Sequence, residues 1–194
     1  MRRTLVAATD NADAGHSAAR QGSAAPYAST VKRVLLTGIS GTGKSTVVRE
    51  LVARGYKAID TDNGWTEPQA DGSQRWREDA LSDLLATEDA DVLFVAGCEE
   101  NQVSFHPRFD HIVLLTAPVE VLLERLATRS GNSYGKTPEE LGRILDDVET
   151  VEPLLRHAAQ HEVATTAPLN EVVSTVLRLV DAREPASRRS SGHA

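Results

Sequence analysis

One segment constrains this chain more than any other: residues 38–45, with the sequence GISGTGKS. It follows the apolar run 31–37 and leads into residues 44–53, whose apolar positions have helical spacing. Glycine, four residues and then Gly-Lys-Ser, between a strand and a helix, is the pattern of a phosphate-binding loop. Glycines permit positive φ angles, so backbone N–H groups can surround an anion at the positive end of the following helix. The segment therefore predicts that the protein binds nucleotide phosphates.

Several residues of this loop have an expected task. Lys44 would reach the outer phosphates of ATP, and the Ser45 hydroxyl would take a position on Mg²⁺. A glycine-rich turn that binds nothing is the alternative, and the strand and helix on either side argue against it. The expected nucleotide contacts in this region are Gly38, Ser40, Gly41, Thr42, Gly43, Lys44, Ser45 and Thr46.

Strand and helix patterns alternate along the rest of the chain. We expect strands at 31–37, 56–59, 91–97, 111–116 and 162–165, and helices that begin near residues 44, 74, 118, 137, 153 and 169. This alternation predicts a parallel sheet covered by helices on both faces, with ligands at the carboxyl ends of the strands. We expect one domain over residues 31–182, a disordered leader over 1–30 and a polar disordered tail over 183–194.

Charge and cysteine content exclude several classes of protein. The formal net charge is −7 and no dense basic cluster is present, which argues against nucleic acid as the main partner. Cys98 is the single cysteine, so the chain can form neither an internal disulfide nor a cysteine zinc site. No apolar run approaches the length that spans a membrane. We expect a cytoplasmic monomer or homodimer that acts on a small molecule.

Two carboxylates follow the second expected strand. Asp60 and Asp62 lie where a pair of acids could hold Mg²⁺ through water and accept a proton from an attacking hydroxyl. An Asp-rich turn is the alternative, because Asp favours turns in any context. The strand ending in Asp that motor and switch ATPases use is absent, since the third expected strand ends in Ala96-Gly97. This absence favours a small kinase.

Two arginines precede a loop of mobile composition. Arg125 and Arg129 are four residues apart on an expected helix and therefore share one face. Residues 130–136 follow, and a lid that closes over the phosphates would bring an arginine to the charge that develops in phosphoryl transfer. A solvated basic face is the alternative. Lys136, within the loop itself, is a weaker candidate for the same task.

Candidates for the acceptor side follow the carboxylate pair and the third strand. Arg77 could bind an anionic group of the acceptor, and a surface ion pair with a neighbouring carboxylate is the alternative. Asn101 and Gln102, together with Glu99 and Glu100, follow the third strand and could form hydrogen bonds with the acceptor.

In these motifs the chain resembles the small P-loop kinases of the shikimate kinase, gluconate kinase and adenylate kinase superfamily. Segment 38–45, segment 60–62, Arg77, the arginine pair and segment 165–168 occur in the expected order. The chain is most similar to kinase-like AAA-type ATPases of high-GC bacteria. The resemblance implies a three-layer α/β/α fold, a five-stranded parallel sheet in the order 2-3-1-4-5, and a lid over the cleft.

The resemblance also implies individual tasks. Asp60 would be the water-mediated partner of Mg²⁺, Asp62 the carboxylate on the acceptor side, and the turn with Thr166 and Pro168 would pack on adenine. The chain departs from shikimate kinases where Ala96-Gly97-Cys98 replaces a triple glycine and where the Arg-Pro-Leu motif of the lid is missing.

These observations predict an enzyme that uses ATP and Mg²⁺. We expect it to transfer the γ-phosphate to a small metabolite, with a nucleoside or nucleotide as the first candidate acceptor and a shikimate-like hydroxy compound as the second. The alternative is a nucleotide-binding regulator or accessory ATPase that has no metabolite acceptor.

Overall fold

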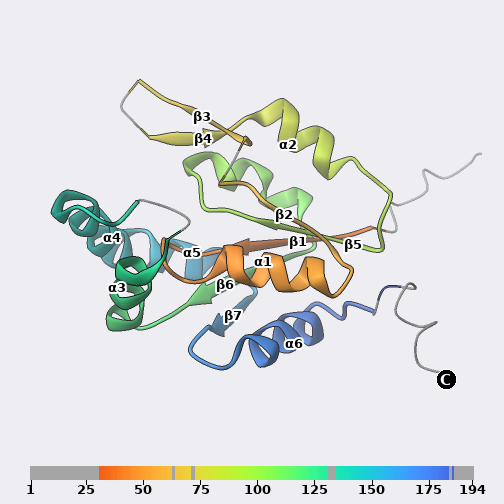
Figure 1. Ribbon diagram of the computed structural model, residues 1–194. Helices are drawn as coiled ribbons and strands as arrows, with labels where there is room; N and C mark the ends of the chain where they lie inside the picture. Colours follow the sequence, from red (N-terminus) through yellow and green to blue (C-terminus); the bar gives the residue numbers. More distant parts are fainter. Residues whose placement is uncertain (1–30, 63, 71–72, 131–133, 184, 186–194) are drawn as a thin grey trace, which may run out of the picture.

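A parallel sheet forms the centre of the computed structural model, which describes residues 31–62, 64–70, 73–130, 134–183 and 185 (Figure 1). The expected leader 1–30 and nearly all of the expected tail lie outside the described residues. The sheet order is β2-β5-β1-β6-β7, and all neighbouring strands are parallel. Its strands are β1 (Lys32–Thr37), β2 (Lys57–Asp60), β5 (Val92–Ala96), β6 (His111–Thr116) and β7 (His161–Ala164).

Counted within this sheet alone, the order is the expected 2-3-1-4-5. The labels run higher because a small separate hairpin, β3 (Thr66–Pro68) and β4 (Gln74–Trp76), takes two of the numbers. The three-layer α/β/α arrangement of the main sheet is confirmed.

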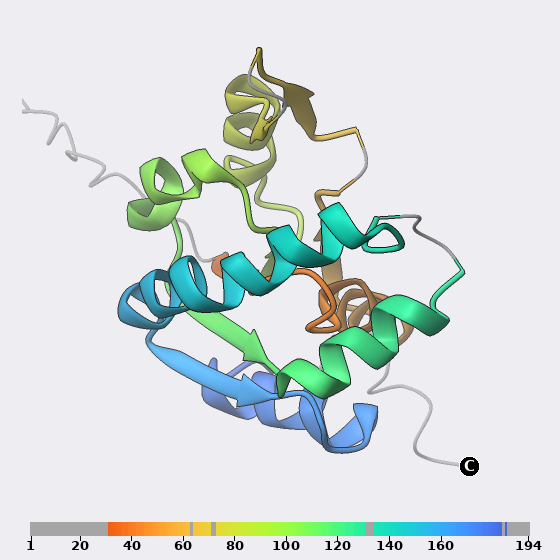
Figure 2. The ribbon, with the colours of Figure 1, turned by 90° about the vertical axis from the view of Figure 1, so that its left-hand side faces the viewer.

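Helices cover both faces of the sheet. One face carries α1 (Lys44–Ala53) and α6 (Leu169–Leu179), and the other carries α2 (Glu78–Leu85), the 3₁₀ helix η1 (Glu100–Arg108) and α5 (Glu152–Ala158). The remaining helices, α3 (Val119–Thr128) and α4 (Pro138–Thr150), lie together at the end where β1 and β6 terminate (Figures 1 and 2).

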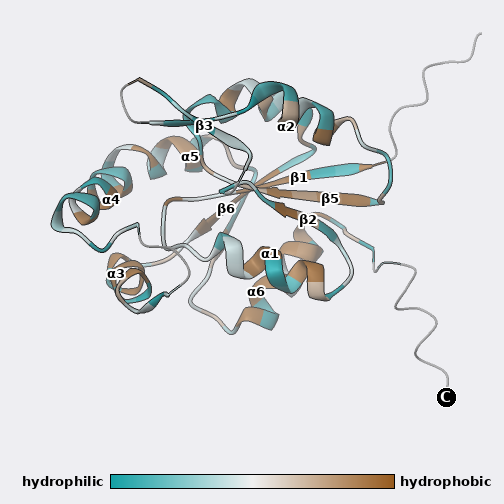
Figure 3. Cartoon of the chain, turned by 45° about the horizontal axis from the view of Figure 1, so that its top comes forward, coloured by the Kyte–Doolittle hydropathy of each residue, from teal (hydrophilic) through white to brown (hydrophobic). Residues whose placement is uncertain are grey.

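Strand β5 is apolar and buried along its whole length, and β1 is so from Val34 to Leu36, because both faces of the central strands are covered. Val34 and Leu36 pack toward α1 and α6, whereas Leu35 between them packs toward α2, and all three are fully buried. The colouring in Figure 3 shows the same pattern, with hydrophobic strands inside and hydrophilic residues on the outer faces of the helices.

The β3–β4 hairpin differs from the expected structure, which had a helix beginning near residue 74. Residues 74–76 pair instead with residues 66–68 in an antiparallel ladder, and α2 begins only at Glu78. Trp76 explains the difference, because its side chain is fully buried and its indole N–H donates to Thr61 Oγ1 at 2.8 Å. The side-chain amide of Asn101 binds the backbone of Trp76 twice: its Oδ1 accepts the Trp76 N–H at 2.9 Å, and its Nδ2 donates to the Trp76 carbonyl oxygen at 3.0 Å. These contacts outweigh the helical pattern of the local sequence.

Other helix boundaries follow local signals. The helix expected to begin near residue 137 starts with a capping box, in which Thr137 and Glu140 each accept a backbone N–H of the other. Within the described ranges, no helix is long and apolar enough to cross a membrane.

A pair of histidines, His111 and His161, lies at the start of β6 and β7, at the end of the sheet opposite the carboxyl ends of its strands. His161 Nε2 lies 3.3 Å from His111 Nδ1, and the two rings are tilted by 34°. Burial lowers the pKa of His111, the charges of His161 and Lys32 lower it further, and Asp110 opposes them. The folded protein therefore resists protonation of this ring.

We predict that this pair makes stability fall as the solution is acidified. Because the pKa of His111 is lower in the folded protein than in the unfolded chain, the unfolded chain binds more protons below about pH 6.5. Wild-type protein should lose more stability in urea denaturation between about pH 7.5 and about pH 5.5 than His111→Gln, which cannot titrate there. Equal losses in the two proteins would contradict this prediction.

Candidate functional site

The loop between β1 and α1 has the backbone of a phosphate cradle. Gly38 and Gly43 have φ angles of 148° and 95°, which side-chain-bearing residues rarely adopt. A Cβ atom on Gly38 would lie 2.5 Å from the carbonyl oxygen of Leu115 on β6. The loop therefore rests directly against the neighbouring strand, and only glycine fits there.

Lys44 lies over this loop. Its ammonium donates hydrogen bonds to the carbonyl oxygens of Gly38, at 2.6 Å, and Ile39, at 3.3 Å. The hydroxyl of Thr42 donates to the same Ile39 oxygen at 2.9 Å, and its side chain is fully buried. Thr42 thus shapes the loop from inside, whereas Lys44 places a positive charge at its surface.

The loop forms one wall of a cleft of about 1060 Å³. The cleft brings together most of the residues that the sequence predicted. Those that line it are Ser40, Gly41, Gly43, Lys44, Ser45, Thr46, Asp60, Asp62, Arg125 and Arg129. Of the expected loop contacts, Gly38 and Thr42 do not line the cleft.

Asp60 and Asp62 line the same cleft as the loop. The backbone N–H of Asp62 donates to Asp60 Oδ1 at 3.2 Å. The two residues thus form the Asp-rich turn that was the alternative interpretation, and this turn lies within the cleft. Asp62 remains exposed to solvent. Partial desolvation within the cleft nevertheless raises the pKa of Asp62. The positive charges of Lys44 and Arg129 oppose this shift, and the negative charge of Asp60 adds to it.

Arg125 joins three parts of the cleft. Its guanidinium donates to the carbonyl oxygen of Gly41 at 3.3 Å and to both Oγ1 and the carbonyl oxygen of Thr165, at 2.9 Å and 2.6 Å. Thr165 is held in turn by β6, through the carbonyl oxygen of Thr116. Arg125 therefore fixes the loop relative to the β7–α6 turn.

Arg129 is placed differently, at the end of α3 and close enough to Asp62 to affect its pKa. One terminal nitrogen donates to the carbonyl oxygen of Tyr134, and within the described residues its buried Nε has no hydrogen-bond partner. Lys136 donates to three carbonyl oxygens at the end of α3, those of Leu126, Ala127 and Arg129. The structure thus gives Lys136 a helix-capping task.

Apart from Asp62, the expected acceptor contacts do not line the cleft. Asn101 and Gln102 are buried, and their amides bond to Trp76 and to Thr37. Arg77 is exposed and donates to the carbonyl oxygen of Gly64 at 3.1 Å, not to a neighbouring carboxylate. Because these amides are already paired inside the protein, they serve to position the hairpin and the end of β1.

In the β7–α6 turn, the cleft is lined by Thr165 and Ala167, whereas Thr166 and Pro168 do not line it. The sequence identified the turn but not which of its alternating residues face inward. Arg49, on α1, also lines the cleft and was missed. Its position one turn after Thr46 on the same helix face is the signal that could have identified it.

Gly97 directly follows β5, at the position where the sequence lacks the water-activating Asp of motor and switch ATPases. A Cβ atom there would overlap with Thr61 Oγ1 and approach the Trp76 ring to 2.8 Å. No side chain fits at position 97 in this packing, because the Thr61 hydroxyl and the buried indole of Trp76 fill the space.

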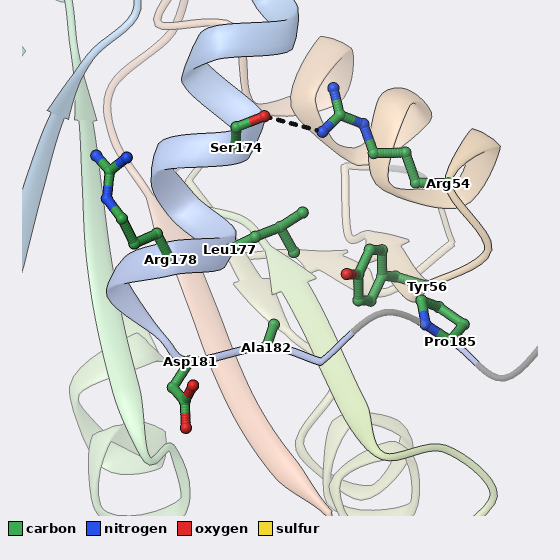
Figure 4. A pocket seen from close by; sticks show the side chains of 8 residues that line it. All are labelled: Arg54, Tyr56, Ser174, Leu177, Arg178, Asp181, Ala182 and Pro185. Atoms are coloured by element: carbon green, nitrogen blue, oxygen red, sulfur yellow. Dashed lines mark hydrogen bonds between the residues drawn. The ribbon is translucent and has the colours of Figure 1, made fainter. Parts of the chain in front are cut away.

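A second cavity, of about 380 Å³, lies at the far end of α1 (Figure 4). Arg54 borders it, and that guanidinium is already paired with Glu50 at 2.8 Å and with Ser174 at 3.2 Å. We assign no ligand to this cavity.

The sheet order, the glycine cradle at a helix N-terminus and Lys44 above it define a P-loop nucleotide-binding protein with the fold of small-molecule kinases. The family model described as AAA domain matches residues 34–147, more than half of the chain. The chain belongs to this family. A search of curated proteins gives no match.

Solved structures share the fold. A shikimate kinase from Acinetobacter baumannii, in complex with shikimate, is 20% identical with a TM-score of 0.60, over 79% of this chain and 95% of that chain. For a shikimate kinase from Bacteroides thetaiotaomicron the identity is 21% and the TM-score 0.57, over 77% and 98%. A gluconokinase from Sinorhizobium meliloti 1021 is 19% identical with a TM-score of 0.50, over 82% and 97%. At these identities the similarity concerns the fold.

We predict that Gly97→Ala destabilises the protein by about 1–3 kcal/mol or more, because the new methyl group overpacks a rigid interior. Gly142→Ala is the matched control, since a Cβ there meets nothing within 4 Å and the residue lies inside helix α4. That control should be stabilised by about 0.5–1 kcal/mol. Urea denaturation measures both changes, and similar stability of the two variants would refute the packing argument.

Proposed function

We propose that the protein is an ATP-dependent phosphotransferase that moves the γ-phosphate of ATP to the hydroxyl group of a small metabolite. One observation carries the proposal: the phosphate loop, the carboxylates of Asp60 and Asp62, and two arginines line a single cleft of about 1060 Å³. The volume is slightly above the range of about 300–1,000 Å³ that is usual for small-molecule sites. It therefore leaves room for a nucleotide and a second molecule.

The residues present fit ATP and Mg²⁺. The loop presents its backbone at a helix N-terminus, and Lys44 lies against it. Ser45 and Asp60 line the same cleft, and Mg²⁺ in such sites takes one or two protein ligands and completes its coordination with phosphate and water. When bound there, Mg²⁺ would neutralise negative charge on the phosphates.

In the proposed reaction, the oxygen of the acceptor hydroxyl forms a bond to the γ-phosphorus, and the bond between that phosphorus and the bridging oxygen of ADP breaks. The hydroxyl proton passes to Asp62, and ADP leaves with the electron pair of the broken bond. Lys44 and Arg129 supply positive charge beside the transferred group. Arg125, whose guanidinium is already bound to the loop and to Thr165, positions the nucleotide side.

The second candidate is a nucleotide-binding regulator or accessory ATPase without a metabolite acceptor. One observation favours it: Arg77, Asn101 and Gln102, the residues expected on the acceptor side, do not line the cleft. The carboxylate pair in the cleft favours the phosphotransferase, because a regulator needs no acid opposite the γ-phosphate.

We predict that ATP consumption will separate the two candidates. Purified protein with Mg²⁺ and ATP is assayed for ADP release with a panel of nucleosides, nucleotides and sugar acids. Stimulation by one acceptor, with a phosphorylated product seen by mass spectrometry, is expected for the phosphotransferase. Binding of ATP without stimulation by any acceptor would favour the regulator.

Two substitutions should separate the tasks within the cleft. Lys44→Ala is expected to abolish ATP binding and activity, because the loop loses its only lysine. Asp62→Asn should lower transfer by about 10²–10⁴-fold, the usual contribution of a general base, while ATP affinity stays nearly unchanged. Asp89→Asn is the matched control, since Asp89 pairs with Lys57 on the surface and does not line the cleft. Collapse of ATP binding in Asp62→Asn would remove Asp62 from the acceptor side.

A further inference from the structure

One corner of the cleft is apolar, although most of the lining is polar or charged. Ala167, Leu169 and Val172 line this corner from the β7–α6 turn and the start of α6, and Val47 lines the cleft from α1. Leu169 is an exposed side chain. A single exposed leucine is ordinary on a convex surface, but apolar side chains gathered in a concave site offer contact to a ligand.

The topology of the sheet separates this corner from the carboxylates. Strand β2 forms one edge of the sheet and β7 the other, and β1, which leads into the phosphate loop, lies between them. Asp60 and Asp62 lie at the end of β2, whereas the apolar corner follows β7. A molecule that extends from the loop into the corner therefore points away from the carboxylates. The corner belongs to the nucleotide and not to the acceptor.

Arg49, on α1, lines the cleft together with these apolar residues. One terminal nitrogen of its guanidinium donates to Thr46 Oγ1, one turn earlier on the helix, at 3.1 Å. Thr46 also lines the cleft, and its backbone N–H donates to the carbonyl oxygen of Gly43 in the loop at 3.0 Å. The guanidinium is thus directed back along α1 toward the phosphate loop.

The positive charge of Arg49 is not neutralised by a carboxylate in the part of the chain that the structure describes. The salt bridges there involve Arg54, Lys57 and Arg156. Glu50, the acid next to Arg49 in sequence, is paired with Arg54 at 2.8 Å. The planar guanidinium of Arg49 is therefore available to an aromatic ring in the cleft, which is a contact that arginine favours.

The two helices that carry this corner are fixed relative to each other. Arg54, further along α1, donates to the hydroxyl of Ser174 at 3.2 Å and to the carbonyl oxygen of Asn170 at 3.4 Å, both on α6. Val47 and Val172 belong to one buried core cluster, and α1 and α6 lie side by side (Figure 1). The site beside Arg49 is therefore formed before a ligand binds.

We propose that Arg49 is a specificity-determining residue for the nucleotide, and that it makes the site prefer purine over pyrimidine bases. Its guanidinium plane covers one face of the base, and the apolar corner of Ala167, Leu169 and Val172 meets the other. A purine has the larger ring face, so it gains more from both the cation–π contact and the apolar contact.

This inference rests on the nucleotide half of the proposed function and deepens it. It names the part of the nucleotide that the apolar corner takes and the residue that covers it. It does not depend on which acceptor receives the phosphate. The alternative is that Arg49 acts only through its charge on the phosphates, and the test below separates the two.

The test measures binding by calorimetry on the full chain with Mg²⁺. The probes are the non-hydrolysable β,γ-imido analogues of ATP, GTP and CTP, together with inorganic tripolyphosphate, which has the phosphates but no base. The ionic strength is about 0.15 M, where exposed charges more than about 8 Å apart are largely screened. We expect the wild-type protein to bind both purine analogues more tightly than the CTP analogue.

Two substitutions tie this preference to Arg49. Arg49→Ala should weaken binding of the ATP and GTP analogues by about tenfold and of the CTP analogue by about threefold, because a smaller ring loses less contact. Tripolyphosphate has no base, and its affinity should change by less than about twofold at this ionic strength. Arg49→Lys keeps the charge without the plane, so it should lower the ratio of purine to pyrimidine affinity and leave tripolyphosphate binding unchanged.

Arg178→Ala is the matched control. Arg178 is an exposed arginine that donates to the hydroxyl of a threonine three residues earlier, Thr175, as Arg49 does to Thr46. It lies on α6 and does not line the cleft. Binding of all four probes should be the same in this variant as in the wild-type protein.

Each outcome decides the inference. A lower ratio of purine to pyrimidine affinity in both Arg49 variants, with tripolyphosphate binding retained, would establish it. Three results would overturn it: no purine preference in the wild-type protein, a ratio that Arg49→Ala leaves unchanged, or a ratio that Arg49→Lys fully retains. A parallel loss of tripolyphosphate and ATP-analogue binding in Arg49→Ala would also overturn it, because the effect would then be one of charge.

The phosphotransferase proposal survives all of these results, since each of them requires only that the wild-type protein binds nucleotides. Failure of the wild-type protein to bind any of the three nucleotide analogues would overturn the proposed function itself.

Discussion

The close approach of the phosphate loop to strand β6 is the constraint on which the rest of the site depends. Gly38 rests against the carbonyl oxygen of Leu115 so tightly that a single Cβ atom would reach 2.5 Å from it. This contact is possible because β1 pairs in parallel with β6 on one side and β5 on the other. The same pairing brings the carboxyl ends of neighbouring strands to one edge, so everything that follows these strands converges on the loop.

The region beyond the ends of β2 and β5 is organised by a buried tryptophan. The indole of Trp76 bonds to Thr61, excludes a side chain at Gly97 and is held through its backbone by Asn101. One large side chain thus links the hairpin, the end of β2, the end of β5 and η1. Such a network is stable because each of its buried polar groups has a partner. It also leaves no space for the water-activating carboxylate of motor ATPases.

Charge is divided unequally across the cleft. Lys44, Arg125 and Arg129 lie in the loop, on α3 and at its end, whereas Asp60 and Asp62 lie at the end of β2 and just after it. Positive charge therefore faces the expected phosphates, and negative charge faces the expected acceptor. The cationic side of the cleft suits the phosphates of a nucleotide, because these meet charge of the opposite sign.

The sequence by itself determined the loop and the turns that carry Asp60, Asp62 and Thr165, because glycine requirements and hydrophobic periodicity are local properties. The strand order followed from the resemblance to small P-loop kinases. Tertiary structure decided which side chains of those segments face the cleft. Asn101 turns inward because it bonds to Trp76, 25 residues earlier in the chain, and the β3–β4 hairpin replaces the start of a helix for the same reason. Partners so distant in sequence leave no periodic signal, so only the folded chain could show them.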